Sequence, residues 1–301
     1  MARIPERCSD RCADLVSSLF DFDAPADRYA VMGNPVAHSK SPIIHAEFAR
    51  QTGQRLLYDA VQVDPGGFAQ AVGNFQAAGG KGLNVTVPFK REAWELVDER
   101  SPRADTAGAV NTISFDAQGR RLGDNTDGIG MVRDIVDNLG GCIRGRRVLL
   151  LGAGGAVRGV LGPLLDERPS AVTVANRTIE RAVELVETFN GMVPLDACGF
   201  ADLAGSRFDL IVNGTAASLH GEALPLPSSV AAGSWCYDMM YAAEPTPFMR
   251  WASAHGAARV DDGLGMLVEQ AAETFFIWRG VRPRTTPVIA LVRGRLGGFD
   301  A

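Results

Sequence analysis

The sequence predicts an α/β protein of two domains, with mainly parallel sheets covered by helices on both faces. Three observations carry this prediction. The 301 residues suffice for about two domains. From Tyr29 onward, short apolar runs alternate with longer amphipathic segments, as strands alternate with helices. The alternation restarts near residues 123–127, so we expect the boundary between the two domains there.

The elements of the first half follow from the spacing of apolar residues. We expect strands where these residues run continuously or alternate, and helices where they recur at helical spacing. Proline in the first turn supports the third helix. We predict strands at Tyr29–Gly33, Leu56–Val63 and Gly82–Val87, helices at Ser41–Thr52, Gly66–Ala78 and Pro88–Asp98, and a hairpin of Val110–Phe115 with Arg120–Gly123.

A predicted helix at Asp127–Leu139 leads into the second half, where the alternation starts again. The next strand is continuously apolar, as in a parallel strand that is buried on both faces. We predict strands at Arg147–Leu151, Ala171–Ala175, Leu210–Asn213 and Ser234–Met239, and helices at Gly155–Glu167, Ile179–Asn190, Pro247–His255 and Gly265–Arg279, the last of which closes the chain.

Composition and charge exclude several classes of protein. A formal net charge of −5 argues against a surface that coats nucleic acid. The longest apolar stretch, Val148–Leu165, contains Arg158 and a glycine-rich turn, so no membrane span is expected. Five scattered cysteines fit free thiols in the cytoplasm and no metal site. Residues 1–28 interleave acidic side chains with arginines, unlike a transit peptide, and are expected to form a partly ordered extension.

A glycine-rich turn follows the first strand of the second half and leads into a helix. It contains Gly152, Ala153, Gly154, Gly155 and Ala156. Glycines let the backbone approach a pyrophosphate, and the helix N-terminus offers N–H donors and a positive dipole. The usual third glycine is replaced by Val157, which indicates slightly wider packing of the helix on the strand. This strand–turn–helix context predicts a dinucleotide-binding site rather than a plain tight turn.

The end of the next strand indicates which dinucleotide is bound. An NAD site usually places Asp or Glu there, to bind a ribose hydroxyl. This chain has Asn176, Arg177 and Thr178 instead, and Arg181 follows Arg177 after one helical turn. The two guanidinium groups can therefore flank one phosphate, and we predict NADP as the cofactor. The alternative is a pair of solvated arginines, which the helix dipole disfavours at a helix start.

Seven polar clusters recur through the chain in a fixed order. They are Gly33–Ser41, Gly82–Lys90, Ala107–Thr112 with Gly123–Gly128, Asn176–Thr178, Tyr237–Tyr241, Thr246–Phe248 and Gly263–Ala271. Together they closely resemble the shikimate dehydrogenase family, from about Tyr29 to Pro287. The resemblance implies a mixed-sheet substrate domain (29–126 and 264–301), a Rossmann-type NADP-binding domain (127–263), and a C-terminal helix that returns to the first domain.

The resemblance also implies an activity, the reversible NADPH-dependent reduction of 3-dehydroshikimate to shikimate in aromatic amino acid biosynthesis. Ser39 and Ser41 would hold the substrate carboxylate, and Tyr241 would lie between that carboxylate and the nicotinamide. The ring hydroxyls would be bound by Asn84, Thr86, Asn111, Asp127 and Gln270. The cofactor would lie beside Asn213, Thr215, Gly263 and Met266. Lys90 and Asp127 would be the catalytic pair.

The types of residue support these substrate contacts independently. A small polyhydroxylated acid needs hydroxyl and amide partners, since each unpaired buried polar group costs about 1–3 kcal/mol. Ser39 and Ser41 alternate with Lys40, so in an extended chain both hydroxyls face one side. Ser41 is also well placed to cap the helix that begins at Pro42. Capping and binding of substrate are compatible.

Reduction of a ketone needs a hydrogen-bond or proton donor at the developing alkoxide. Lys90 lies in the first turn of its predicted helix and Asp127 begins another, where the dipole disfavours the cation and favours the anion. Lysine accounts for only three of the 30 basic residues, and Lys90 stands where a guanidinium could not release a proton. The sequence leaves open whether Lys90 transfers the proton or only stabilises the alkoxide. A simple ion pair is the structural alternative.

Two other functions fit parts of the sequence. One is a quinate/shikimate paralogue that uses NAD, against which Ser39, Ser41 and the Asn176–Thr178 cluster argue. The other is a catalytically silent nucleotide sensor on the same scaffold, which would have no need of Lys90 and Asp127. We expect a small-molecule substrate as the partner, neither nucleic acid nor membrane, and a monomer or homodimer in solution.

Overall fold

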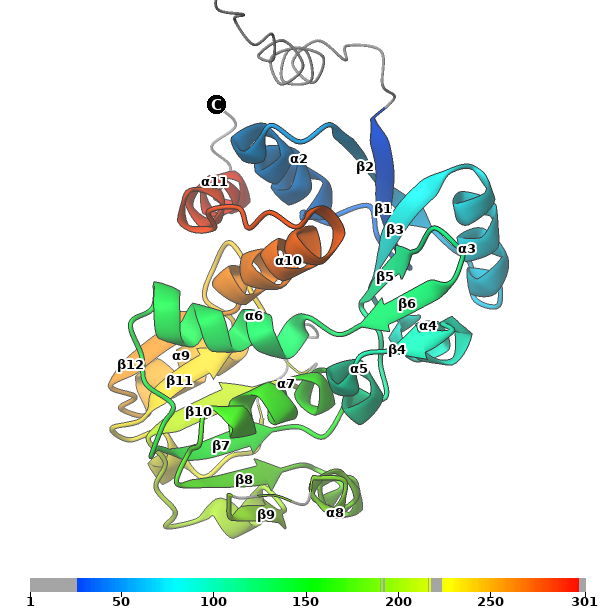
Figure 1. The fold of residues 1–301 in the computed structure, drawn as a ribbon. Coiled ribbons are helices and arrows are strands. Elements are labelled where there is room, and N and C mark those ends of the chain that lie inside the picture. The colour runs from blue at the N-terminus through cyan, green and yellow to red at the C-terminus, as the bar shows by residue number, and fades with distance from the viewer. Residues whose placement is uncertain (1–25, 190, 192, 216, 218–223, 298–301) are drawn as a thin grey trace, which may run out of the picture.

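The described part of the molecule is built around two six-stranded sheets, which lie one above the other in Figure 1. The computed structural model describes residues 26–189, 191, 193–215, 217 and 224–297. The predicted α/β class with two domains is confirmed. Residues 1–25 of the expected extension lie outside the described residues, but its last two, Asp27 and Arg28, already belong to the first strand. The predicted end of the extension at residue 28 is therefore wrong, because Asp27 bonds to Arg55 of the neighbouring segment.

The first sheet is mixed and has the strand order β2-β1-β3-β5-β6-β4. Its strands are β1 (Asp27–Gly33), β2 (Leu56–Gln62), β3 (Gly80–Val85), β4 (Glu99–Arg100), β5 (Thr112–Phe115) and β6 (Arg121–Asp124). Strand β1 lies between β2 and β3 and is parallel to both. Strand β5 runs antiparallel to β3 and β6, which confirms the predicted hairpin.

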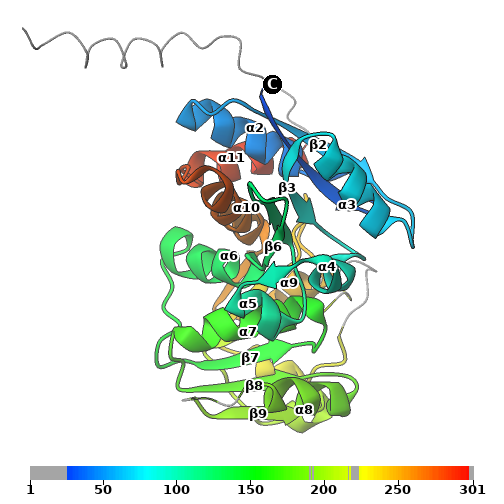
Figure 2. The same ribbon diagram turned by 45° about the vertical axis from the view of Figure 1, so that its right-hand side comes forward.

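Helices cover both faces of this sheet (Figure 2). One face carries α3 (Phe68–Ala77), α4 (Lys90–Leu96) and α5 (Pro102–Ala107), and the other carries α2 (Ser41–Thr52), α10 (Leu264–Arg279) and α11 (Thr286–Leu296). The sequence prediction that the chain closes with the helix ending at Arg279 is wrong, because α11 follows it. Helix α11 buries only Val288 and Val292, and so narrow an apolar face gives little periodicity in the sequence.

The second sheet is fully parallel, in the order β12-β11-β10-β7-β8-β9. Its strands are β7 (Arg147–Leu151), β8 (Ala171–Ala175), β9 (Leu195–Cys198), β10 (Leu210–Asn213), β11 (Trp235–Asp238) and β12 (Arg259–Asp262). The order reverses between β7 and β10, and ligands of such sheets bind beyond the carboxyl ends of the strands at this point. Strands β9 and β12 were not predicted, because their short sequences contain aspartates and lack continuous apolar runs.

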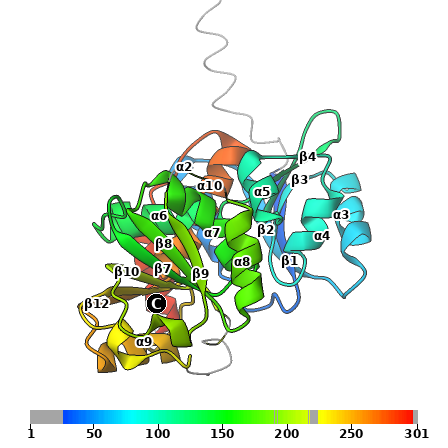
Figure 3. The same cartoon turned by 90° about the horizontal axis from the view of Figure 1, so that it is seen from below.

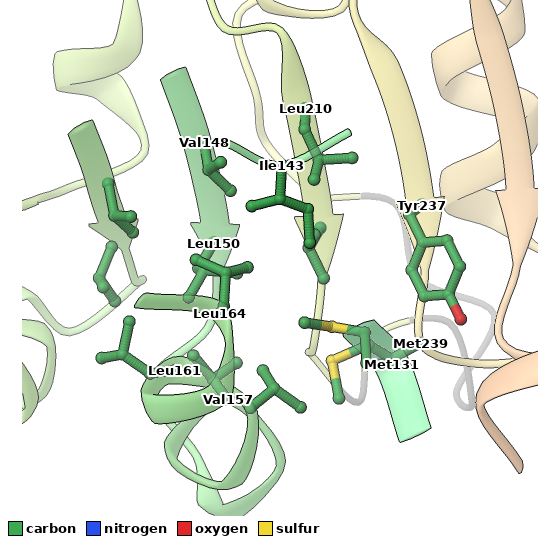
Figure 4. Packing of buried hydrophobic residues seen from close by; sticks show 14 of the residues in the cluster. Met131, Ile143, Val148, Leu150, Val157, Leu161, Leu164, Leu210, Tyr237 and Met239 are labelled. Carbon is green, nitrogen blue, oxygen red and sulfur yellow. The ribbon is translucent and has the colours of Figure 1, made fainter. Parts of the chain in front are cut away.

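Two apolar layers hold the second sheet. Helices α7 (Gly155–Asp166) and α8 (Ile179–Glu187) pack on one face, and α9 (Pro247–Ala254) packs on the other (Figure 3). Val148 and Leu150 of β7 belong to the first layer, and alternate residues of the strand belong to the second. Val157, at the third fingerprint position, packs with Met131 and Met239 (Figure 4). A valine there fills the space between α7 and the sheet.

One helix joins the two halves. Helix α6 (Asp127–Arg133) packs against α10 at Gly130, where a Cβ would lie 2.7 Å from the Cβ of Gln270. It packs against α7 at Gly128, where a Cβ would lie 2.6 Å from the carbonyl oxygen of Gly159. Both glycines therefore allow close packing of helices, and Asp127 at the start of α6 is held between the two halves.

Helix α6 continues as a π-helical turn at Asp134–Asn138, whereas the sequence predicts one regular helix to Leu139. At this turn the buried carboxylate of Asp134 accepts hydrogen bonds from the Tyr237 hydroxyl at 2.8 Å and from Asn138 at 3.1 Å. Apolar periodicity carries no signal for such a polar anchor. Of the helices in the described ranges, none combines the length and the apolar character needed to cross a membrane.

Candidate active site

The predicted catalytic pair forms in the structure. Nζ of Lys90, the first residue of α4, lies 2.6 Å from Oδ2 of Asp127, the first residue of α6. The side chain of Asp127 is 10% exposed and that of Lys90 is 30% exposed. The ammonium group is therefore held from the protein side and remains accessible from outside.

The second oxygen of the Asp127 carboxylate is fixed by Asn111. Nδ2 of Asn111 donates to Oδ1 of Asp127 at 2.8 Å and to Oγ1 of Thr126 at 3.0 Å. Oδ1 of Asn111 accepts from the backbone N–H of Thr126 at 2.9 Å. The backbone N–H of Asp127 itself donates to Oδ1 of Asn125 at 3.1 Å. Both carboxylate oxygens and the backbone N–H of Asp127 thus have hydrogen-bond partners, which hold the carboxylate toward Lys90.

The network continues from Asn111 to Asn84 at the end of β3. Nδ2 of Asn84 donates to the carbonyl oxygen of Asn111 at 3.1 Å and lies 3.3 Å from the hydroxyls of Thr112 and Thr274. Oδ1 of Asn84 accepts from the hydroxyl of Tyr58 at 2.7 Å. Asn84 is 6% exposed, so its amide is mostly used inside the protein.

The two serines are placed differently from the extended pattern that the sequence suggested. Lys40, between them, has helical φ and ψ of −88° and −7° and is the N-cap of α2. The extended arrangement is therefore wrong, and so is the prediction that Ser41 caps the helix, because Ser41 is its first residue. Oγ of Ser39 instead accepts from the backbone N–H of Ser41 at 3.2 Å. This turn places both side chains at the start of α2.

Three further predicted substrate residues lie around this network. Gln270 on α10 reaches Oγ1 of Thr126 at 3.4 Å, beside Asp127. Thr86 follows β3 directly, and its methyl group occupies the space that a Cβ at Gly33 would fill, only 2.3 Å away. Tyr241 packs against the apolar cluster of α2, α10 and α11. Burial and, to a smaller degree, the charge of Asp262 raise the pKa of the Tyr241 phenol above its usual value.

The glycine-rich turn has the shape that a pyrophosphate needs. Gly152 has φ of +107°, which few other residues adopt. A Cβ at Gly154 or Gly155 would meet no atom within 4 Å, so open space borders the N-terminus of the twelve-residue helix α7. Ala153, between Gly152 and Gly154, and Ala156, directly after Gly155, are half-buried. The turn lies at the point where the strand order reverses, and we conclude that it fits a dinucleotide phosphate.

The end of β8 carries free positive charge. Arg177 and Arg181 are exposed, and neither forms an ion pair within the part of the chain that the structure describes. Nδ2 of Asn176 donates to the carbonyl oxygen of Thr178 at 2.7 Å, which shapes the loop before α8. An NAD site usually has Asp or Glu at the end of this strand. Here β8 ends at Ala175 and is followed by Asn176, so no carboxylate stands at that position. The residues present fit a 2′-phosphate.

The remaining predicted cofactor residues lie beside this turn. The side chain of Asn213, fully buried at the end of β10, accepts from the backbone N–H and hydroxyl of Thr215 and donates to Asp238. Asn213 therefore shapes the loop rather than presenting its own amide. A Cβ at Gly263 would lie 2.3 Å from the carbonyl oxygen of Met239. Met266 is 8% exposed and belongs to the core of the second sheet.

The catalytic pair and the nucleotide turn are close in the fold. The side chain of Asn125, which fixes the backbone of Asp127, lies against Gly159 of α7, where a Cβ would be 3.3 Å from the Asn125 amide. Gly159 follows Gly155 by one helical turn. Figure 1 shows the starts of α6 and α7 on the side of the second sheet that faces the first. A reacting atom near Lys90 can therefore lie beside a nucleotide bound at α7.

Sequence reasoning missed five polar residues of this network. Thr112, Asn125 and Thr126 stand in the polar clusters around Asn111 and Asp127, so the sequence held a signal for them. Thr274 follows Gln270 by one turn on the otherwise apolar face of α10. Tyr58 had no signal, because a tyrosine in an alternating strand is equally typical of an ordinary sheet.

A buried histidine beside this network predicts a pH-dependent stability. His45 on α2 is fully buried, and neither of its ring nitrogens has a hydrogen-bond partner among the described residues. Burial, opposed by a smaller effect of Asn84, lowers the pKa of His45 to about 3. Between that value and the ordinary 6.5, the unfolded chain binds a proton that the folded chain does not, so stability falls as the pH falls.

We expect His45→Phe to remove this acid-induced loss of stability. The free energy of unfolding of the unchanged protein should drop faster between pH 6.5 and pH 4, by up to about 1.4 kcal/mol per pH unit for the one proton. Urea unfolding measured at several pH values would check this result. The exposed His38 provides a control, because His38→Phe should keep the original pH profile. Parallel profiles of the unchanged protein and His45→Phe would contradict the prediction.

The fold and the site together define an oxidoreductase that uses a dinucleotide, with a lysine–aspartate pair beside the nucleotide turn. Three family models match in succession, namely the shikimate dehydrogenase substrate binding domain (residues 31–113), shikimate / quinate 5-dehydrogenase (134–220) and the shikimate 5′-dehydrogenase C-terminal domain (263–293). The NADP(+) shikimate dehydrogenase of Alkalilimnicola ehrlichii is 61% identical over 268 residues, 89% of this chain and 98% of that protein. The chain therefore belongs to the shikimate dehydrogenase family.

Solved structures agree in fold. An Ael1 enzyme from Pseudomonas putida is 48% identical with a TM-score of 0.85, over 88% of this chain and 98% of that one. Shikimate 5-dehydrogenase from Thermus thermophilus, solved in complex with NADP(H) and shikimate, is 32% identical with a TM-score of 0.78. The match covers 89% of this chain and 98% of the Thermus chain.

Proposed function

We propose that this protein catalyses the reversible, NADP-dependent interconversion of shikimate and 3-dehydroshikimate. The observation that carries this proposal is the Lys90–Asp127 pair at 2.6 Å, held by Asn111 and Asn125 one helical turn from the glycine-rich turn. The relatives named as NADP(+) shikimate dehydrogenases support the choice of cofactor and substrate over quinate with NAD. A silent sensor would not need the pair.

In the direction of reduction, bound NADPH would supply the hydride that the carbonyl carbon needs. The oxygen then gains negative charge, and the ammonium group of Lys90 donates a hydrogen bond and the proton that completes the alcohol. Asp127 holds Lys90 in place through its 2.6 Å contact with Nζ. In the oxidative direction, the same amine accepts the hydroxyl proton.

The other predicted residues take supporting roles in this proposal. Ser39, Ser41 and Tyr241 would bind the carboxylate, and Asn84, Thr86, Asn111 and Gln270 would face the ring hydroxyls. On the cofactor side, the pyrophosphate would be bound by Gly152, Ala153, Gly154, Gly155 and Ala156, the 2′-phosphate by Asn176, Arg177, Thr178 and Arg181, and the nicotinamide would be bordered by Asn213, Thr215, Gly263 and Met266. The substrate domain, residues 29–126 and 264–301, would move relative to the NADP domain, residues 127–263.

One assay tests the proposal. Purified protein with shikimate and NADP should produce reduced nicotinamide, followed by its absorbance. With quinate or with NAD the specificity constant kcat/KM should be lower by at least about tenfold, the loss expected when one buried polar contact is unpaired. Equal rates with NAD, or no rate with shikimate, would contradict it. We also propose a cytoplasmic enzyme that is a monomer or homodimer, which sedimentation equilibrium would distinguish.

A further inference from the structure

The hydroxyl of Tyr58 lies between two predicted substrate residues from different elements. Tyr58 projects from β2 and donates to Oδ1 of Asn84, on β3, at 2.7 Å. The side chain of Ser41, at the start of α2, is near enough to the same hydroxyl to lower its pKa slightly, against the larger effect of burial. One phenol oxygen therefore lies near the residue proposed for the substrate carboxylate and is bonded to a residue proposed for the ring.

The ring of Tyr58 is fixed in its plane. It stacks on the imidazole of His45, with centroids 4.2 Å apart and an angle of 6° between the planes. His45 is in turn enclosed by the rings of Phe48, Phe275 and Trp278, at centroid distances of 6.0, 6.1 and 5.5 Å. Close packing of this kind restricts the rotation of the Tyr58 side chain. The buried imidazole therefore serves as a platform that limits where the Tyr58 hydroxyl points.

The hydroxyl determines which way the Asn84 amide faces. Its proton goes to Oδ1, which leaves Nδ2 directed at the Asn111 carbonyl and the hydroxyls of Thr112 and Thr274. The pKa of the Tyr58 phenol is raised well above its usual value, mainly by burial. The hydroxyl therefore keeps its proton and remains a hydrogen-bond donor. Without the Tyr58 hydroxyl, Oδ1 of the nearly buried Asn84 would lose the donor that β2 provides. A buried acceptor left unpaired reorients or takes up water.

We propose that Tyr58 is a positioning residue for substrate recognition, whose hydroxyl holds Ser41 and Asn84 in the orientation that receives a small hydroxylated carboxylic acid. The inference rests on the proposed function, because it takes Ser41 and Asn84 as substrate residues. It adds a residue on β2 that touches neither reacting atoms nor cofactor. Its effect is therefore confined to the substrate side of the site.

The variant Tyr58→Phe tests this role, because it removes one oxygen and keeps the stacked ring. We expect KM for shikimate to rise about tenfold, the loss typical of one buried hydrogen bond, while KM for NADP stays within about twofold. Tyr29→Phe is the matched control. Tyr29 is 3% exposed and stacks on Trp278 at 4.4 Å, but its hydroxyl meets Arg279, outside the network. Tyr29→Phe should leave both constants unchanged.

Two more variants separate the possible failures. Ser41→Ala should raise KM for shikimate, and the double variant with Tyr58→Phe should raise it by less than the product of the two single effects. If Ser41→Ala has no effect, the proposed site itself is wrong. If Ser41→Ala raises KM but Tyr58→Phe does not, or if their effects multiply, the positioning role of Tyr58 is overturned.

Folding is checked by circular dichroism and by the thermal midpoint of each variant. Thr274→Val is the second variant if Tyr58→Phe folds poorly, because it removes another anchor of the Asn84 amide at nearly constant volume. It should raise KM for shikimate and spare KM for NADP. An unchanged KM for shikimate in this variant would overturn the inference that a fixed Asn84 amide is what recognises the substrate.

Discussion

Lys90→Arg is expected to lower kcat by about 10²–10⁴-fold, the usual contribution of a positioned acid–base group. The substitution preserves the positive charge beside Asp127, 2.6 Å away. A guanidinium holds its proton with a pKa above about 12, and its planar fork is longer than an ammonium group. It can neither release a proton to the alkoxide nor place a single donor where Nζ lies. Steady-state rates at saturating shikimate would measure the loss.

A second lysine provides the control for the chemical change itself. Lys81 on β3 is exposed and forms no ion pair with any described residue, so Lys81→Arg should keep full activity. Lys90→Ala separates the two possible roles of the amine. If charge alone stabilises the alkoxide, Lys90→Arg should be clearly more active than Lys90→Ala, whereas proton transfer predicts that both are similarly inactive and that added methylammonium partly restores only the alanine variant. Near-normal turnover of both Lys90→Arg and Lys90→Ala would contradict both roles.

The partner of Lys90 can be tested in the same way. In Asp127→Asn, the amide oxygen can still accept from Asn111, which now donates to Oδ1 at 2.8 Å. The amide nitrogen would then face the ammonium group, donor against donor. We expect a loss of kcat comparable to that of Lys90→Arg. KM for NADP should stay unchanged, because Asp127 faces Lys90 and Asn111 rather than the glycine-rich turn.

The fold was predictable where one signal dominates. The strand Arg147–Leu151 and the turn after it were found because a continuous apolar run followed by closely spaced glycines is typical of a buried parallel strand that enters a helix. Helix α11 was missed because it packs onto elements as distant as α2 and shows a weak pattern of its own. Strand β12 was missed because its four residues include two aspartates and no apolar run. Asp134, in the π-helical turn, bonds to Tyr237 about a hundred residues later in the chain, and no local pattern records such a contact.

The site divides in the same way. Lys90, Asp127 and Asn111 stand in clusters whose residue types already suggest polar chemistry, and the structure brings them within hydrogen-bond distance. The arrangement of Ser39 and Ser41 was wrong in detail, because alternation implies an extended chain and Lys40 is helical. Tyr58 could not be found, since its importance arises from the pairing of β2 with β1 and of β1 with β3. Motifs show which side chains are polar, but strand order shows which of them meet.

Replacing both arginines at the end of β8 should abolish the preference for NADP. Arg177 and Arg181 are exposed and carry charge that no acidic group among the described residues neutralises, and cations at a helix start oppose its dipole. A bound 2′-phosphate relieves both costs. Each charge-assisted hydrogen bond to it is worth about 1.5–3 kcal/mol, so each single alanine variant should raise KM for NADP by roughly 10–150-fold.

The cofactor NAD, which lacks this phosphate, provides the internal comparison. In the double variant that combines Arg177→Ala and Arg181→Ala, KM for NAD should change little. The ratio of kcat/KM for NADP to kcat/KM for NAD should therefore fall toward unity. Arg144→Ala is the matched control, because Arg144 is also exposed but precedes β7, at the opposite end of the parallel strands. If the double variant lost NADP and NAD equally, the two arginines would be stabilising the fold of the loop around Asn176 and not recognising a phosphate.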